Sequence, residues 1–131
     1  MKKIFFGLLG VAALSIAAFA QQGTMQSTTM KSNYLEYSKE AFDKASSAKR
    51  VLFFAASWCP SCRSADKNFN ENLKKIPENV MIFKTDYDKE TALKTKYKIT
   101  RQHSFVYVDA KGVALKSWAG GGIDELLAAV K

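Results

Sequence analysis

Short runs of mostly apolar residues stand out from the mixed pattern of the chain at 51–55, 80–83 and 104–108. These runs are rich in β-branched and aromatic side chains, and a continuous apolar run of this length is typical of a strand buried on both faces. Two further segments have strand character, and residues 109–112 form a turn that joins the last two strands as a hairpin. Strands are predicted at 34–37, 51–55, 80–83, 104–108 and 113–118.

Between the strands, apolar residues recur at helical spacing. Ala41, Phe42 and Ala45 follow this spacing, and Ser38 precedes them as an N-cap. Helices are predicted at 39–48, 61–75, 88–96 and 123–130. Strands and helices alternate first, which predicts parallel pairing, and the closing hairpin adds antiparallel strands. We therefore predict an α/β fold with a central mixed β-sheet flanked by helices.

The first twenty residues have a different character. Lys2 and Lys3 precede a run of seventeen residues, 4–20, that is apolar apart from Ser15 and ends Ala-Phe-Ala. This pattern predicts that residues 1–20 are a secretory signal peptide. We therefore predict that the protein is exported to the periplasm. The alternative is an uncleaved anchor, for which the run is short, since a spanning helix needs about 20 apolar residues. Residues 21–33 are polar and predict a flexible leader, which leaves 34–131 as the domain.

Length and charge narrow the range of partners. The chain has 131 residues, which suits one small domain, and its net charge is +8. Removing residues 1–20 would lower that charge to +6. An exported protein meets little nucleic acid, so we interpret the basic balance as a solvated surface and predict no nucleic-acid partner. Steering toward an acidic partner or an anionic membrane surface is a weaker alternative.

The two cysteines of the chain, Cys59 and Cys62, lie two residues apart directly after the run at 51–55. A structural disulfide there would close a four-residue loop and contribute only about 2 kcal/mol by loop entropy. A zinc site usually needs four Cys or His ligands, and His103 is the one histidine available. Two unrelated buried thiols would leave the flanking Trp58 and Pro60 unexplained.

A redox-active dithiol is the interpretation we prefer. The strand-to-helix turn puts the sulfur of Cys59 at a helix N-terminus, where backbone N–H groups and the helix dipole stabilise a thiolate. We predict that Cys59 is the more exposed cysteine and attacks a substrate disulfide. Cys62, one turn into the helix, would then resolve the mixed disulfide.

The segment 54–62, FAASWCPSC, resembles the active-site segment of the thioredoxin superfamily. The resemblance covers 34–131 and includes Tyr-Lys-Ile-Thr at 97–100 and Asp-Ala-Lys-Gly at 109–112. It implies a thioredoxin-like fold and thiol–disulfide exchange without an organic cofactor, a reductase or electron relay more than an oxidase. It also implies protein thiol or disulfide clients and a recycling redox partner. We predict a monomer and, from the signal pattern, no stable membrane insertion after cleavage. The residues expected to shape the site are Trp58, Pro60, Ser61, His103 and Ser104.

The chain departs from the family pattern at two positions. His103 occupies the place of the usual cis-proline, and Ser104 follows it, so we expect a trans or rearranged loop there. Phe53 replaces the buried acid that the family carries six residues before the first cysteine, which would leave Lys84 without its partner and Cys62 without an internal base. The alternative function is non-enzymatic: a metal-handling or partner-docking domain that uses Cys59, Cys62 and His103.

Overall fold

The strand predicted at 51–55 is the centre of the observed sheet. In the computed structural model, which describes residues 32–131, it extends over Lys49–Ala55 as β2. The other strands are β1 (Tyr34–Glu36), β3 (Val80–Asp86), β4 (Ser104–Val108) and β5 (Ala114–Ala119). The helices are α1 (Lys39–Lys44), α2 (Pro60–Glu71), α3 (Thr91–Lys96) and α4 (Ile123–Ala129), with a 3-10 turn, η1, at Leu73–Lys75.

The strands form one mixed sheet in the order β1-β3-β2-β4-β5. β3 pairs in parallel with both β1 and β2, whereas β4 pairs antiparallel with β2 and with β5. On β2, Phe53 lies opposite Lys84 of β3 on one side and Phe105 of β4 on the other. This topology confirms the predicted α/β fold with a mixed central sheet.

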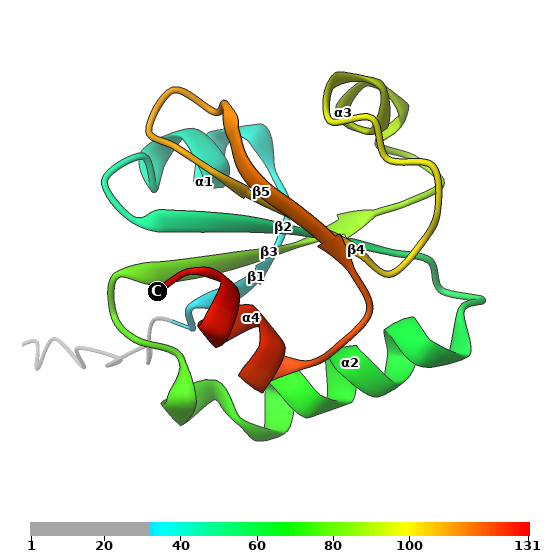
Figure 1. Ribbon diagram of the computed structural model, residues 1–131, viewed down its shortest axis with the longest axis horizontal. Helices are drawn as coiled ribbons and strands as arrows, with labels where there is room; N and C mark the ends of the chain where they lie inside the picture. The colour runs from blue at the N-terminus through cyan, green and yellow to red at the C-terminus, as the bar shows by residue number, and fades with distance from the viewer. Residues whose placement is uncertain (1–31) are drawn as a thin grey trace, which may run out of the picture.

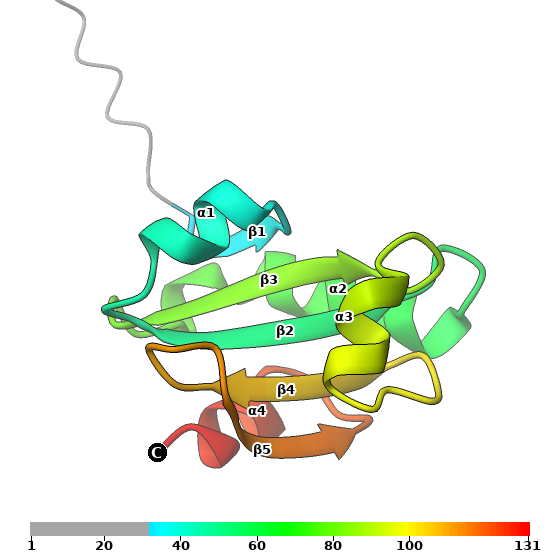
Figure 2. The same ribbon diagram turned by 90° about the horizontal axis from the view of Figure 1, so that it is seen from above.

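Helices cover both faces of the sheet. α2 and α4 lie on one face and α1 and α3 on the other, as the two views show (Figures 1 and 2). Alternate side chains of β2 enter the two resulting cores: Val51 and Phe53 join the α2/α4 side, and Leu52 and Phe54 join the α1/α3 side. All four are fully buried, which explains why the sequence of β2 is apolar without alternation.

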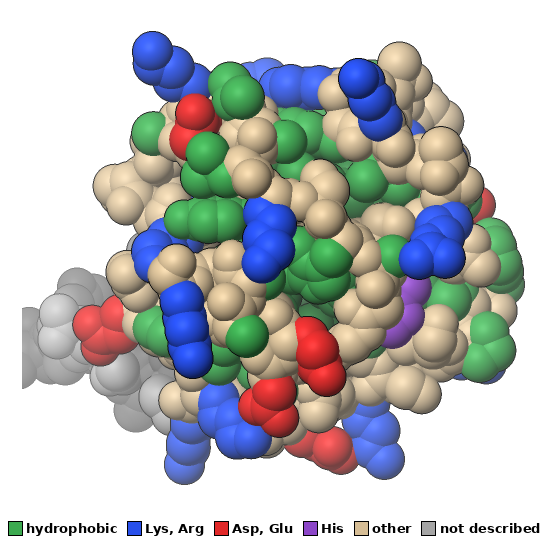
Figure 3. Space-filling view, in the orientation of Figure 1, with side chains coloured by type: hydrophobic (Ala, Val, Ile, Leu, Met, Phe, Trp, Pro, Cys, Tyr) green, Lys and Arg blue, Asp and Glu red, His purple; other side chains and the backbone are tan. Residues whose placement is uncertain are grey.

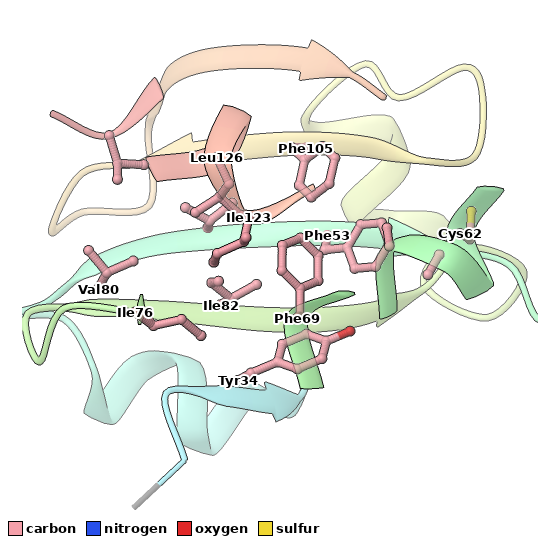
Figure 4. Packing of buried hydrophobic residues seen from close by; sticks show 14 of the residues in the cluster. Tyr34, Phe53, Cys62, Phe69, Ile76, Val80, Ile82, Phe105, Ile123 and Leu126 are labelled. Atoms are coloured by element: carbon pink, nitrogen blue, oxygen red, sulfur yellow. The ribbon is translucent and has the colours of Figure 1, made fainter. Parts of the chain in front are cut away.

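Aromatic rings hold α2 against the sheet. Phe69 of α2 packs edge-on against Phe53, with ring centroids 5.4 Å apart, and lies 5.2 Å from the ring of Tyr34 in β1. Phe53 in turn stacks on Phe105 of β4 at 4.7 Å. Figure 4 shows these rings in one cluster, with Cys62 beyond its end. The helix that carries the cysteines is therefore positioned by the centre of the core, as expected for interdigitated packing.

The predicted end of one helix and the predicted start of another are wrong by a few residues, because hydrogen bonds in the flanking turns shorten both helices. After α1, the N–H of Ser46 bonds to Asp43 and that of Ala48 to Ala45, which makes turns of 45–48 instead of helix. α3 begins at Thr91 and not at 88, because an oxygen of the Asp86 side chain accepts the N–H groups of residues 88 and 89.

The predicted signal peptide, 1–20, and most of the predicted leader lie outside the described residues. Asn33, at the end of that leader, bonds to the sheet: its carbonyl accepts from Ile82 at 2.8 Å and its side chain donates to Pro77 at 2.9 Å. Between residues 32 and 131, no helix is both long enough and apolar enough to cross a membrane.

Candidate active site

The sulfur of Cys59 caps the N-terminus of α2. Cys59 is the N-cap residue, with an extended backbone, and its Sγ accepts a hydrogen bond from the N–H of Cys62 at 3.2 Å. Pro60 occupies the first helical position, where a missing N–H carries no penalty. The hydroxyl of Ser61 lies 3.3 Å from the same sulfur. The predicted position of Cys59 at a helix N-terminus is therefore observed, in the place that favours a negative charge.

The two thiols differ strongly in acidity. Burial alone would raise the pKa of Cys59, but hydrogen bonds from Cys62 and Ser61 to its sulfur outweigh burial and lower that pKa. Burial, together with the hydrogen bond that the Cys62 thiol gives to Cys59, raises the pKa of Cys62 to about 11. Of the two thiols, Cys59 therefore ionises more readily, and the thiolate is the form of a cysteine that attacks a disulfide.

Exposure does not distinguish the two cysteines. Cys59 is 2% exposed and Cys62 is 1% exposed, so the two side chains differ only slightly, in the direction that was predicted. The larger difference between the two cysteines is in the acidity of their thiols.

Trp58 forms the exposed edge of the site. Its side chain is 55% exposed, and its indole N–H donates to Asp88 Oδ2 at 3.0 Å. Asp88 lies in the turn before α3, so this bond links the cysteine loop to the end of β3. The indole is thereby fixed at the edge of the loop that carries Cys59, with more than half of its surface exposed.

The backbone at His103 explains why no proline occupies this position. Its φ is +56°, a left-handed conformation, and its N–H donates to the carbonyl of Phe54 at 2.8 Å. Proline fixes φ near −65° and has no N–H, so it fits neither feature. Between residues 32 and 131 every peptide bond is trans, which confirms the expectation of a trans loop.

The His103 loop lies beside the dithiol, but its imidazole is directed elsewhere. The backbone N–H of His103 is close enough to Cys62 to lower the pKa of that thiol. The ring nitrogen Nε2 pairs with the carbonyl of Gly121 at 2.9 Å, and the ring packs edge-on against Phe53 and Phe105. The chain's one histidine reaches the surface in Figure 3 (purple). The imidazole thus ties two loops together, and Ser61 and Cys62 supply the bonds that stabilise the Cys59 thiolate.

Ser104 also has a local role. Its hydroxyl donates to the carbonyl of Arg101 at 2.8 Å, and the residue is buried. Across the described part of the chain, no three side chains of the His, Cys, Asp and Glu types gather closely enough to hold a metal ion. Cys59, Cys62 and His103 therefore do not form a metal site in this conformation.

One acidic residue of the site was missed by sequence reasoning. Phe53 packs in the core as predicted, but Lys84 is not left without a partner: its ammonium lies 3.2 Å from Asp66 and 3.5 Å from Glu36. Tyr34 also donates to Asp66, at 2.6 Å. The spacing could have identified Asp66 as a residue near the site, because it follows Cys62 by four residues and so lies on the same face of the predicted helix.

The difference in acidity predicts two separate thiolate titrations in the reduced protein. Thiolate absorbance should rise first below the usual thiol range, about 8.5, and again near 11. Iodoacetamide at neutral pH should modify Cys59 and leave Cys62 protected. Cys62→Ser should keep the first step and lose the second. A single transition near 8.5 for both thiols would contradict the assignment.

The loop geometry predicts a large effect on stability for one substitution of His103 and a small effect for another. His103→Pro removes the N–H that bonds to Phe54 and cannot adopt the observed φ, so it should lower the free energy of unfolding by about 2 kcal/mol or more. His103→Gly keeps the N–H and relieves the left-handed strain while losing the ring contacts, so its net change should stay below about 1 kcal/mol. Urea denaturation measures both. Wild-type stability in the proline variant would mean that the loop can leave this conformation.

Comparison with known proteins agrees with the geometry. A family model described as thioredoxin matches residues 31–131. Thioredoxin H5 of Arabidopsis thaliana is 34% identical over 94 residues, which cover 70% of this chain and 78% of that protein. Thioredoxin H4 of the same plant is 30% identical over 90 residues, covering 67% and 75%.

Solved structures share the fold. Reduced thioredoxin pre-protein of Schistosoma mansoni matches with a TM-score of 0.62 at 22% identity, covering 74% of this chain and 94% of that one. Thioredoxin NaTrxh from Nicotiana alata matches with a TM-score of 0.63 at 21% identity, covering 76% and 90%. The family model, the two Arabidopsis relatives and the dithiol at the start of α2 show that the chain belongs to the thioredoxin family and is a thiol–disulfide oxidoreductase.

Proposed function

We propose that this thioredoxin acts in the reducing direction, on disulfides of exported proteins. The observation that supports this most is the pairing of a thiolate, Cys59, with a protonated neighbour, Cys62, at the start of α2. Such a pair is ready to attack a disulfide and to close the exchange within the same site. The relatives with the highest similarity reported above are named thioredoxins, which favours reduction over oxidation.

The exchange would run in two balanced steps. The Cys59 thiolate attacks one sulfur of the client disulfide, a mixed disulfide forms, and the other client sulfur leaves with its electron pair. Cys62 then loses its proton and attacks the sulfur of Cys59, which releases the second client sulfur as a thiolate. Two electrons pass from the dithiol to the client, and the cysteines end as a disulfide.

The exposed surface around Cys59 is suited to a protein client. Trp58 presents an exposed aromatic side chain beside the sulfur, and the loop at 101–103 borders the site on the other side of Ser61. Family membership suggests protein thiol substrates and a reductase partner that renews the dithiol. For an exported protein, that partner would have to carry electrons to the far side of the membrane.

Export is supported by the sequence pattern at 1–20, a basic start followed by an apolar run and small residues. Expressed with its full sequence in a bacterial host, the protein should be recovered from the periplasm with Gln21 as its first residue. N-terminal sequencing of that fraction checks the cleavage, and a Cys59→Ser variant should be processed identically because cleavage does not depend on the dithiol. A membrane-bound chain that still begins at Met1 would support the anchor instead.

The direction of electron flow is tested by the reduction potential of the dithiol. Equilibrated with glutathione, the mature protein should have a potential near that of thioredoxin, about −270 mV. A value near −120 mV would identify an oxidant and contradict the proposal. Cys62→Ser, which cannot form the internal disulfide, is the control for adventitious oxidation.

A further inference from the structure

A cavity with several charged side chains in its wall lies behind Cys62, between α2 and the strands β1 and β3. Its volume is about 180 Å³, enough for several water molecules. Cys62 forms part of the wall, and the charged side chains around it come from β1, α2 and β3. The lining residues are Glu36, Ala55, Ala56, Ser57, Cys62, Arg63, Asp66, Lys84 and Asp86.

Asp66 is fixed in this cavity by one of its two oxygens. Tyr34 donates to Oδ1 at 2.6 Å, and the ammonium of Lys84 lies 3.2 Å from the same oxygen. Burial and the bond to Asp66 raise the pKa of Tyr34, so its hydroxyl stays protonated and acts as a donor. Within residues 32–131, no group donates a hydrogen bond to Oδ2 of Asp66. One oxygen is therefore held while the other remains able to accept a proton.

The other charged groups around the cavity are less suited to accept a proton from Cys62. Lys84 and Arg63 are cations, and the Arg63 guanidinium donates to the carbonyl of Ser57. The side chain of Glu36 is 79% exposed, and Asp86 accepts two backbone N–H groups of the following turn. Asp66 is the carboxylate on the same helix face as Cys62, four residues later.

We propose that Asp66 is the proton acceptor for the Cys62 thiol, reached through water in this cavity, and that Tyr34 and Lys84 are positioning residues for Asp66. The proposal rests on the thiol–disulfide exchange described above and concerns its second step. In the mixed disulfide, the proton of Cys62 passes by water to Asp66. The electron pair left on the sulfur of Cys62 forms the bond to Cys59, the bond from Cys59 to the client breaks, and the client sulfur leaves as a thiolate that takes up a proton.

The second step can be followed alone with oxidised glutathione as the disulfide. Reduced protein is mixed with oxidised glutathione, the reaction is quenched with acid at successive times, and mass spectrometry counts the Cys59–glutathione adduct. In the wild type the adduct should be short-lived. In Asp66→Asn it should accumulate at neutral pH because its decay slows by about 100-fold, the lower range for loss of a general base. Glu71→Gln removes an exposed carboxylate of the same helix that does not line the cavity, and its adduct should decay as that of the wild type does.

The pH profile separates proton transfer from a structural role. The Asp66→Asn defect should shrink as pH rises, because hydroxide then deprotonates Cys62 directly and the carboxylate is no longer needed. A defect of the same size at every pH, or no defect at neutral pH, would overturn the proposal. Tyr34→Phe keeps the carboxylate and most of the ring packing, and should slow adduct decay several-fold at neutral pH only. An unchanged rate in that variant would overturn the positioning role of Tyr34.

The same experiment distinguishes an error in the role of Asp66 from an error in the proposed function. Formation of the adduct uses the Cys59 thiolate and its bonds from Cys62 and Ser61 but not Asp66, so it should proceed at the same rate in the wild type and in Asp66→Asn. If the wild type forms no adduct, the exchange itself is absent and both proposals fail. If adduct forms and decays equally in both proteins, the exchange stands and Asp66 is not its proton acceptor.

Discussion

The chemistry of this protein depends on the hydrogen bond from the N–H of Cys62 to the sulfur of Cys59. That bond exists because α2 begins at Pro60, directly after a cysteine whose backbone is still extended. The start of α2 is in turn set by the end of β2, and β2 is held by buried side chains on both of its faces. A neutral thiol at that position would accept the bond weakly, whereas a thiolate accepts it strongly, so the fold selects the charged form.

The same geometry makes the two sulfurs unequal partners. Cys59 gains hydrogen bonds from Cys62 and Ser61, and Cys62 loses water without gaining comparable donors. A single negative charge shared by two close sulfurs is more stable than two charges, so stabilising one thiolate raises the pKa of the other. The division of labour between nucleophile and resolving thiol is thus a property of one helix turn and needs no distant residue.

Features that depend on consecutive residues could be predicted from the sequence alone. The apolar run of β2, the strand at Ser104–Val108 and the position of Cys59 before a proline all follow from local pattern, and the structure has them as predicted. The early end of α1 and the late start of α3 depend on hydrogen bonds in the flanking turns. The spacing of apolar residues along the sequence carries no information about these bonds. The contact of Tyr34 with Asp66 joins residues 32 apart, and no local signal marks it.

The partner of Lys84 shows why a family pattern transfers imperfectly. An acid at position 53 would be fully buried between Phe69 and Phe105, and a charge there would lose its hydration in an aromatic core. Phe53 avoids that cost and strengthens the ring stack that positions α2. The carboxylate stands instead on α2 itself, where the side chain of Asp66 is 30% exposed and both Tyr34 and Lys84 reach it. Asp66 and Cys62 line the same cavity, so a carboxylate on the helix shares a solvent-filled space with this thiol while the core around Phe53 stays apolar.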